Sequence, residues 1–273
     1  MKTKRAKKSL GQHFLTSRAH AKKIADAAAI APNDAVLEIG PGKGMLTKEL
    51  LARAEKVVAV EKDADLVPVL ARAFAEEISR GTLAVVRGDI LKQNPKELGF
   101  EAGKYIVAAN IPYYISGRLV RFFLESETRP KRIVFLMQKE VAERIAAKDG
   151  KESVLSLSVK AYGDPTCKEI VPARYFSPKP KVDSAILLID RVANKNFPDA
   201  NARDLFFTIV KRGFSQKRKT ILNNLRELLG ERGEETLREA GIRATDRAEN
   251  IPLENWLRLG GILRRNSQRG SHR

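Results

Sequence analysis

The side chains that build metal centres and disulfides are scarce in this sequence. It holds one cysteine, Cys167, and three histidines, His13, His20 and His272. A single cysteine cannot form a disulfide within the chain, which is typical of proteins from a reducing compartment. The same scarcity excludes a cysteine-based metal site, and the scattered histidines suggest no set of three ligands. We therefore predict a cytoplasmic protein that uses no metal.

Long apolar runs are also missing. No run approaches the roughly 18 residues that a membrane-spanning helix needs. The amino-terminal residues lack the apolar region of a secretory signal. We therefore expect no membrane partner.

Acidic side chains are in deficit. The 33 Asp and Glu stand against 51 Lys and Arg, which gives a net charge of +18 and a sequence pI of about 10.0. The excess is clustered: residues 1–23 hold eight Lys and Arg and no acid, residues 211–219 hold five more, and the last sixteen residues hold five Arg. A solvated surface of balanced charge does not explain such segments, whereas a polyanionic partner does. The pattern favours nucleic acid, and RNA in particular.

Strands alternate with helices through the middle of the chain. Apolar, β-branched runs predict strands at residues 35–39, 56–61, 82–89, 105–110 and 132–138, with helical periodicity between them. This alternation predicts an α/β fold with a parallel, doubly wound sheet. Two more strand-like runs, 154–163 and 182–190, have no helix between them. We expect them to form an antiparallel hairpin at the sheet edge.

The remainder of the chain has a different pattern. Residues 192–201 are polar and include proline and asparagine, as a linker does, and only helical periodicity follows them. We predict a first domain at residues 1–195, including the basic amino-terminal segment, and a small helical domain at residues 200–273.

A glycine-rich turn follows the first strand. In EIGPGKG, Gly40, Gly42 and Gly44 would let a ligand approach the backbone at the start of a helix. A tight strand–helix turn explains these glycines about equally well. However, Glu61 and Asp89 end the next two strands, where carboxylates can hold a ribose and an adenine amine. The combination predicts an adenosine-containing cofactor, either NAD or S-adenosylmethionine, and the G-x-G-x-G spacing disfavours NAD.

The fourth strand ends in Asn-Ile-Pro-Tyr. An amine on an adenine or cytosine ring is a poor nucleophile, so an enzyme that methylates it needs hydrogen-bond acceptors and a flat surface for the base. Asn110 offers an amide oxygen, and Ile111, held extended by the following proline, offers its carbonyl. Tyr113 can stack on an extruded base. A turn alone would explain the asparagine and the proline but not Tyr113, and Tyr114 has no evident role.

These segments together resemble a known family. GQHFL (11–15), EIGPGKG (38–44), NIPYYIS (110–116), FSPKPKVDSAIL (176–187) and GFSQKRKTILNNL (213–225) occur in the same order in the small-subunit rRNA adenine dimethyltransferases. The resemblance implies a Rossmann-like class I fold and S-adenosylmethionine as methyl donor. It further implies dimethylation of two adjacent adenosines in the 3′-terminal hairpin loop of 16S rRNA, within a pre-30S particle. We expect the enzyme to be a monomer.

The resemblance also assigns site residues. Those expected to bind the cofactor are His13, Leu15, Gly40, Gly42, Glu61, Asp89 and Asn110. Asn110 and Tyr113 resemble the catalytic pair, and Phe176 resembles the second aromatic face that sandwiches the target base. We also expect Lys217, Arg218 and Lys219 to contact the RNA backbone, although a solvated helix face explains any one of them equally well.

Three alternatives remain open at this point. The first is a large-subunit (23S) rRNA methyltransferase of the kind that confers macrolide resistance, because Ile111 is the usual residue in that related group. A ribosome-assembly or transcription factor without catalytic activity could use the same fold, but none of the site residues is lost here. A nicotinamide oxidoreductase is disfavoured by the glycine spacing and by the basic charge.

Overall fold

The computed structural model describes residues 11–147 and 150–270, so the basic residues 1–10 lie outside it, as does the carboxyl-terminal end of the last basic segment. Residues that contact one another separate into two units. Of the described residues, 11–142 and 163–193 group as the first, and 143–147, 150–162 and 194–270 as the second. We describe each unit by itself. The functional division that the sequence suggested, 1–195 and 200–273, remains a prediction.

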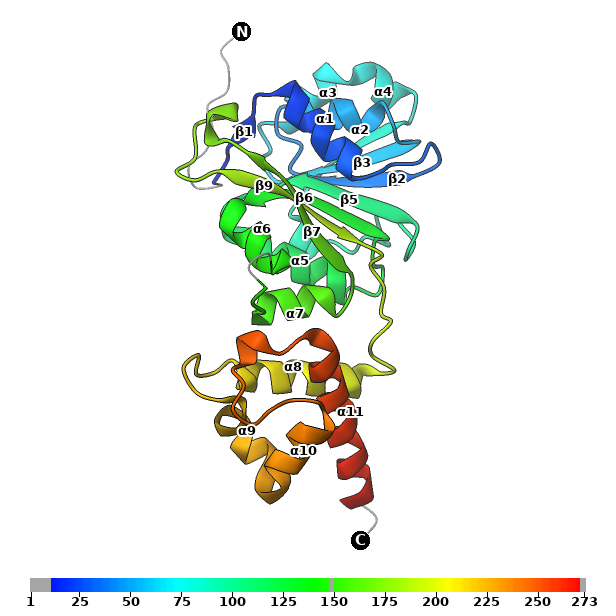
Figure 1. Ribbon diagram of the computed structural model, residues 1–273. Coiled ribbons are helices and arrows are strands. Elements are labelled where there is room, and N and C mark those ends of the chain that lie inside the picture. The colour runs from blue at the N-terminus through cyan, green and yellow to red at the C-terminus, as the bar shows by residue number, and fades with distance from the viewer. Residues whose placement is uncertain (1–10, 148–149, 271–273) are drawn as a thin grey trace. The chain divides into compact units, whose positions relative to one another are not determined.

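A seven-stranded sheet is the centre of the first unit (Figure 1). Its strands, in the order in which they lie, are β4 (Leu83–Arg87), β3 (Lys56–Glu61), β2 (Ala35–Ile39), β5 (Tyr105–Asn110), β6 (Arg132–Gln138), β9 (Ser184–Asp190) and β7 (Asp164–Val171). The first five strands are parallel, whereas β9 runs antiparallel to both of its neighbours. The prediction of a mostly parallel sheet with an antiparallel edge is confirmed.

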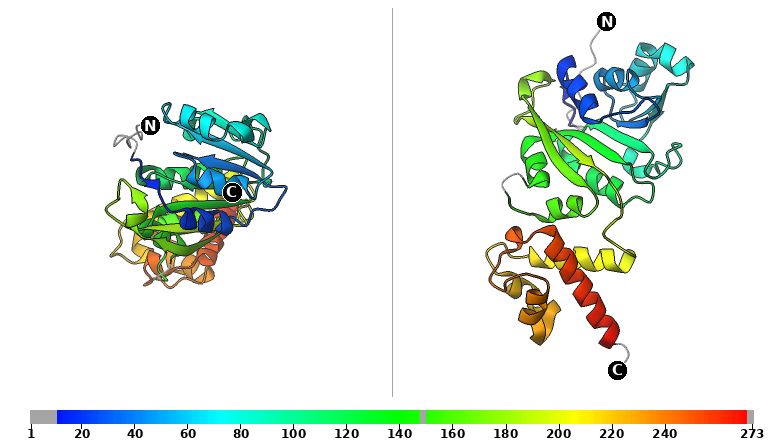
Figure 2. Two further views of the ribbon diagram at one scale, coloured as in Figure 1. Left: turned by 90° about the horizontal axis from the view of Figure 1, so that it is seen from above. Right: turned by 45° about the vertical axis from the view of Figure 1, so that its right-hand side comes forward.

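Helices cover both faces of this sheet. The helices α1 (Arg18–Ala27), α2 (Met45–Leu51), α3 (Val67–Ala73) and α4 (Ala75–Ser79) lie on one face, and α5 (Ser116–Glu125) lies on the other (Figures 1 and 2). The central strands are therefore buried on both sides, which is why they read as continuous apolar runs. In β5, every residue from Tyr105 to Ala109 is buried.

The strand register brings the polar strand ends together. Ile39 of β2 is paired with Val60 of β3 on one side and with Ala109 of β5 on the other. The next residues along these three strands are Gly40, Glu61 and Asn110. Because parallel strands end at the same edge of a sheet, these three positions are neighbours there, at the switch point where such folds bind ligands. The short 3₁₀ segments η2 (Ile90–Lys92) and η3 (Tyr113–Ile115) follow β4 and β5 at the same edge.

A second, two-stranded sheet connects distant parts of the first unit. Strand β1 (Phe14–Leu15) pairs antiparallel with β8 (Phe176–Ser177), so that Leu15 lies opposite Phe176. The Thr16 amide also donates to the Tyr175 carbonyl, with a nitrogen–oxygen distance of 2.8 Å. The amino-terminal GQHFL motif is thereby fixed to the FSP motif.

The prediction of a strand at residues 154–163 is wrong. Residues Val154–Lys160 form helix α7, and the strand that pairs with β9 is β7. The reason is local: Ser153 Oγ accepts from the Ser156 amide at 3.0 Å, and Ser156 Oγ accepts from the Ser153 amide at 2.6 Å. This reciprocal cap satisfies two amides at the helix start, and it outweighs the β-branched residues that suggested a strand.

The second unit is helical, as predicted. Besides α7 it contains α8 (Ala200–Gly213), α9 (Ile221–Leu229), α10 (Gly233–Glu239) and α11 (Leu253–Gly270), while α6 (Lys139–Ala146) runs from the first unit into it. Trp256 is completely buried, and its indole N–H donates to the Ile251 carbonyl at 3.0 Å. A Cβ at Gly213 would lie 2.3 Å from the Trp256 ring, so only glycine lets α8 lie against the indole. Among the described residues, no helix is both long enough and apolar enough to cross a membrane.

Candidate functional site

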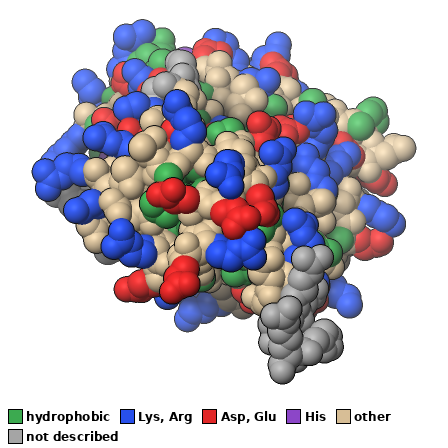
Figure 3. Space-filling model, turned by 60° about the horizontal axis from the view of Figure 1, so that its bottom comes forward, with side chains coloured by type: hydrophobic (Ala, Val, Ile, Leu, Met, Phe, Trp, Pro, Cys, Tyr) green, Lys and Arg blue, Asp and Glu red, His purple; other side chains and the backbone are tan. Residues whose placement is uncertain are grey.

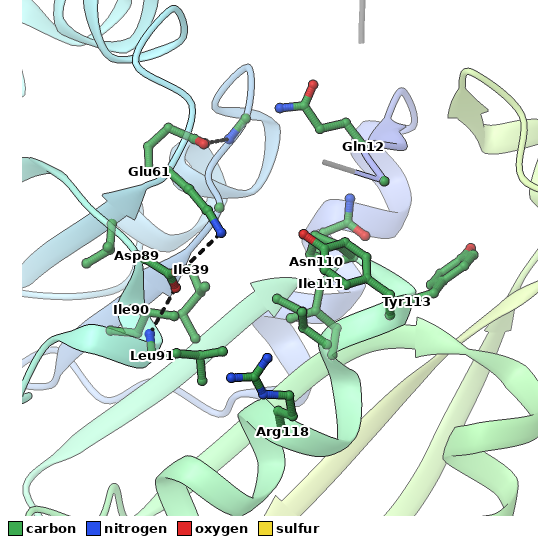
Figure 4. Close-up of a pocket in the computed structure, with 18 of the residues that line it drawn as sticks. Gln12, Ile39, Glu61, Asp89, Ile90, Leu91, Asn110, Ile111, Tyr113 and Arg118 are labelled. Atoms are coloured by element: carbon green, nitrogen blue, oxygen red, sulfur yellow. Dashed lines mark hydrogen bonds and ion pairs between the residues drawn. The ribbon is translucent and has the colours of Figure 1, made fainter. Parts of the chain in front are cut away.

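A cavity of about 230 Å³ opens at the carboxyl ends of the parallel strands in the first unit (Figure 4). Its walls come from the amino-terminal segment, the glycine turn after β2, the end of β3, η2 after β4, and the segment from Asn110 to Arg118 after β5. Of the predicted site residues, it brings together His13, Gly40, Gly42, Glu61, Asp89, Asn110 and Tyr113.

The glycine turn forms one wall of the cavity. Gly40 has a φ of +61°, which a side chain would strain, and a Cβ there would meet no other atom within 4 Å. The backbone of Gly40 is therefore bare toward open space, as a cradle for a ligand requires. At Gly42 the situation differs, because a Cβ would lie 3.0 Å from the Phe14 ring. Gly42 thus allows the amino-terminal segment to close over the turn.

Two backbone amides hold the Glu61 carboxylate in place. The Gly42 N–H donates to Oε2 at 3.0 Å, and the Asp63 N–H donates to Oε1 at 2.8 Å. Only 4% of the Glu61 surface is exposed. Burial raises the pKa of Glu61, and the two amide hydrogen bonds oppose that rise. The carboxyl group is thus fixed in direction, and each of its oxygens has a further lone pair with which to accept a ligand hydroxyl.

Asp89 begins η2 and carries a second carboxylate to the cavity. The Leu91 N–H donates to Oδ1 at 3.2 Å, and the Lys62 ammonium donates to Oδ2 at 2.9 Å. Burial alone would raise the pKa of Asp89, but the Lys62 ammonium and the Leu91 amide outweigh burial, and the pKa is lowered. Asp89 is therefore an ionised acceptor at neutral pH.

The side-chain amide of Asn110 is oriented by the chain itself. Its Nδ2 donates to the His13 carbonyl at 2.9 Å. Because a carbonyl can only accept, the nitrogen of Asn110 must face His13, and Oδ1 is left as the acceptor on the opposite side of the amide. The adjoining Ile111 is 2% exposed, and its N–H donates to the Leu136 carbonyl at 3.1 Å. The backbone beneath Asn110 is thus tied to the neighbouring strand β6.

The ring of Tyr113 is held by its hydroxyl and by one face. Its hydroxyl lies 2.8 Å from Ser184 Oγ. The ring stacks with His13, with centroids 5.6 Å apart and planes 24° from parallel. Burial raises the pKa of Tyr113, so the phenol is neutral at neutral pH. His13 Nδ1 in turn lies 2.7 Å from the Pro178 carbonyl, so this nitrogen must carry the proton. Figure 4 shows Asn110, Ile111 and Tyr113 along one side of the cavity.

The other predicted residues lie elsewhere. Leu15 and Phe176 are 7% and 4% exposed, belong to the hydrophobic core and do not line the cavity; Phe14 lines it instead. Phe14 and Leu15 are neighbours in β1, and successive side chains of a strand point to opposite faces. Phe14 therefore faces the cavity when Leu15 faces the core. A role for Phe176 in holding a base therefore has no support from this geometry, and its assignment stays a prediction.

The three predicted RNA contacts lie in the second unit. Lys217, Arg218 and Lys219 are exposed on the turn between α8 and α9. Asn224 holds this turn, because its Nδ2 donates to the Gly213 carbonyl at 2.6 Å and to the Gln216 carbonyl at 3.1 Å. The turn is therefore ordered, whereas its basic side chains point into solvent. Figure 3 shows one face of the molecule on which Lys and Arg are spread widely, with Asp and Glu among them.

The cavity also contains residues that the sequence reasoning missed. The most notable are Gln12, Lys62, Tyr114 and Arg118. Lys62 directly follows Glu61 at the end of β3, so its position in the sequence could have indicated its place. Gln12 Nε2 donates to Asp63 at 3.1 Å, a contact across 51 positions that no local pattern reveals.

The chain is similar to known proteins over nearly its whole length. The family model described as "Ribosomal RNA adenine dimethylase" matches residues 3–264. A protein of Dehalococcoides mccartyi, named ribosomal RNA small subunit methyltransferase A, is 40% identical over 260 residues, which are 94% of this chain and 88% of that protein.

Two solved structures are similar along nearly the whole chain. The 23S rRNA methyltransferase ErmE superposes with a TM-score of 0.77 at 30% identity, over 92% of this chain and 99% of its own. A dimethyladenosine transferase from Plasmodium falciparum superposes with a TM-score of 0.78 at 28% identity, over 94% of this chain and 98% of its own.

Proposed function

Since the chain belongs to the ribosomal RNA adenine dimethylase family, we propose that it dimethylates the exocyclic amines of two adjacent adenosines in the 3′-terminal hairpin loop of 16S rRNA. S-adenosylmethionine is the methyl donor, and the pre-30S particle is the substrate. The proposal includes a monomeric enzyme that works in the cytoplasm without a metal. The observation that carries it is Asn110, whose amide is turned by the His13 carbonyl so that Oδ1 is an acceptor at the edge of the cavity.

The residues of the cavity fit the proposed cofactor. Gly40 leaves an open cradle beside the helix start, and Glu61 presents a carboxylate of fixed direction. Two carboxylates at neighbouring strand ends suit the two hydrogen-bonding parts of an adenosine, the ribose diol at Glu61 and the adenine amine at Asp89. When bound, S-adenosylmethionine would supply a methyl group that is already activated by its sulfonium.

The chain's own part in the reaction is to hold the amine. Oδ1 of Asn110 and the carbonyl of Ile111 would accept hydrogen bonds from the amine and so favour its tetrahedral form, which has a free lone pair. Tyr113, fixed by Ser184 and His13, would offer a ring on which the base stacks. Most of the acceleration would come from proximity and alignment, because a well-oriented pair of reactants gains many powers of ten in rate.

The sequence similarity favours a small-subunit substrate over a large-subunit one. The chain is 40% identical to a protein named for the small subunit and 30% identical to the 23S rRNA methyltransferase ErmE. The 23S rRNA methyltransferase ErmE nevertheless superposes with a TM-score of 0.77 over 92% of this chain, so the backbone alone does not exclude a large-subunit substrate. The test must therefore offer both.

The proposal is tested by methyl transfer. Purified 30S particles that lack the modification, and 50S particles, are incubated with the enzyme and labelled S-adenosylmethionine, and the modified nucleotides are then identified. We expect two dimethyladenosines in the 30S particle only. Label in 23S rRNA would favour the alternative of a large-subunit rRNA methyltransferase. No label in either particle would contradict the proposed activity.

Substitution of Asn110 provides the matched variant. Removing one preorganised hydrogen-bonding group from a reaction centre, such as an oxyanion-hole donor, typically lowers kcat by about 10²–10³. We expect Asn110→Ala to lose that much, while its dissociation constant for the 30S particle stays within about twofold. Asn201→Ala removes an exposed asparagine from α8 and should leave kcat unchanged. Wild-type methylation by Asn110→Ala would disprove the role of this amide.

A further inference from the structure

Two side chains at the mouth of the cavity have no part in the reaction described above. Tyr114 belongs to η3, and Arg118 lies four residues later in the first turn of α5. Both line the cavity, and both are exposed. The exposed fraction of Tyr114 is 60%, which is high for an aromatic side chain beside a binding site. An aromatic ring and a guanidinium at the entrance would suit a ligand that has both a flat ring and an anionic group.

The direction of the Tyr114 ring is set by Gly11. A Cβ at Gly11 would lie 3.1 Å from Cδ1 and from Cε1 of this ring, so the glycine lets the ring rest against the amino-terminal segment. Gly11 has a φ of +56°, which other residues rarely adopt. One edge of the ring is thus supported while most of its surface faces solvent. A supported, exposed ring is a ready surface for stacking a base at low entropic cost.

Arg118 supplies a charge that the described chain does not neutralise. In residues 11–147 and 150–270 no hydrogen bond or ion pair is found for its guanidinium. Figure 4 shows the side chain turned toward the cavity, beside Leu91. The Lys62 ammonium is close by: its pKa is raised mainly by its hydrogen bond to Asp89, with smaller effects of opposite sign from Tyr114 and Arg118. Because Asp89 is paired with Lys62, Arg118 is left as a positive charge at this end of the cavity.

The chemistry of the proposed cofactor excludes it as the partner of Arg118. The cofactor has one anionic group, the carboxylate of its methionine part, which lies at the opposite end of the molecule from the adenine. Asp89, which would hold the adenine, is at the same end of the cavity as Lys62 and Arg118. The cofactor also carries net positive charge, so added cations there would repel it. An RNA strand, in contrast, brings one phosphate with every nucleotide.

We infer that Tyr114 and Arg118 form a subsite for a nucleotide adjoining the target adenosine, whose base stacks on Tyr114 and whose phosphate pairs with Arg118. This inference rests on the proposed function, because it assumes that an RNA strand enters the cavity. The subsite would hold the strand in register while the target base is turned inward. Proteins that hold single-stranded RNA use aromatic rings to stack its bases and basic side chains to bind its phosphates.

The test compares substitutions in steady-state kinetics with undermethylated 30S particles. Loss of one phosphate contact lowers the salt slope of log K by about 0.7 for a single strand. We expect Arg118→Gln to raise KM for the particle about tenfold at low salt and to flatten that slope. Tyr114→Ala should raise KM by about tenfold as well, since it removes the surface on which one base stacks. Tyr114→Phe keeps the ring and should stay within about twofold of wild type.

Control measurements separate the possible failures. The dissociation constant for S-adenosylmethionine, measured by calorimetry without RNA, should not change in any variant. Arg72→Gln removes an exposed charge from α3, away from the cavity, and should leave KM unchanged. If the wild-type enzyme does not methylate the particle, the proposed function fails. If it does, but Arg118→Gln and Tyr114→Ala bind the particle normally or lose cofactor binding instead, this inference alone is overturned.

Discussion

The two units place their functional residues in different ways. In the first unit, residues far apart in sequence meet at one edge of a sheet, and side chains such as Glu61 and Asn110 are fixed by backbone groups on neighbouring segments. In the second unit, the predicted contacts Lys217, Arg218 and Lys219 are consecutive and exposed on one turn. Chemistry on a small group requires the first arrangement, whereas attraction to a phosphate backbone needs only the second.

Different contacts hold the functional side chains of the two units in place. The site of the first unit depends on strand register, since a shift of one position would turn every strand-end side chain to the opposite face. The basic turn of the second unit depends on Asn224 and on the close approach of Gly213 to Trp256. We therefore expect the two functions to be separable by mutation, and the following changes test that separation.

Trp256→Ala should have the largest effect. The side chain is completely buried, and truncation of a buried tryptophan typically costs about 3–5 kcal/mol. We expect the second unit to lose its packing while the first keeps its cavity. Urea unfolding followed by circular dichroism would show an early transition, and calorimetry would show S-adenosylmethionine binding preserved.

A matched variant in the first unit sharpens this test. Phe135 is a completely buried aromatic residue of β6, so Phe135→Ala should instead destabilise the sheet and weaken cofactor binding. If Trp256→Ala abolishes cofactor binding as strongly as Phe135→Ala does, the functions of the two units cannot be separated by mutation.

Much of the site was predictable because it follows from strand ends. A glycine turn after the first strand and acids after the next two predicted Gly40, Glu61 and Asp89 at one edge, and the structure brings them together. Asn110, which ends the fourth strand, was predicted on the same basis, and it lines the same cavity. The sheet itself was predictable, since strands buried on both faces have a strong apolar signature.

Other features depend on contacts that a linear pattern does not contain. The helix at Val154–Lys160 forms because two serines cap it reciprocally, although its residues favour a strand. Phe176 stays a predicted site residue on its motif, and its burial in the core beside Leu15 follows from the pairing of β1 with β8, which the sequence does not show. Arg118 is a surface residue by sequence, and only the fold places it at the cavity mouth.

A buried acid beneath the glycine turn makes stability depend on pH. Burial raises the pKa of Glu38 from 4.5 to about 8, and the charge of Glu61 adds to the rise while the Thr47 hydroxyl opposes it. Between those two pH values the Glu38 carboxyl is ionised in the unfolded chain and neutral in the folded protein. The folded protein therefore binds one proton more than the unfolded chain, so the free energy of unfolding falls as the pH rises through this range. The stabilising effect of keeping Glu38 neutral is lost above about pH 8. Glu38→Gln should remove the dependence.

The expected result is unusual, because the variant should become more stable than wild type at high pH. We expect a gain in unfolding free energy on the order of 4 kcal/mol at pH 8, and little change at pH 4.5. Thermal unfolding across this range measures it. Glu97→Gln, at an exposed acid, is the control and should leave the wild-type pH profile intact. Parallel profiles for Glu38→Gln and wild type would show that Glu38 is ionised in the folded protein.

Charge removal on the turn of the second unit should have the smallest effect and the most selective one. Lys217→Gln, Arg218→Gln and Lys219→Gln in one chain should weaken 30S binding about tenfold at low salt, and less as salt rises, because screened phosphate contacts contribute less. Unfolding and cofactor affinity should not change, since all three side chains are exposed. A matched triple change, Lys48→Gln, Arg72→Gln and Lys96→Gln, removes the same charges from exposed positions of the first unit. If both triple variants weaken binding equally, net charge alone attracts the particle. The turn then has no special role, and specificity must come from the cavity and its mouth in the first unit.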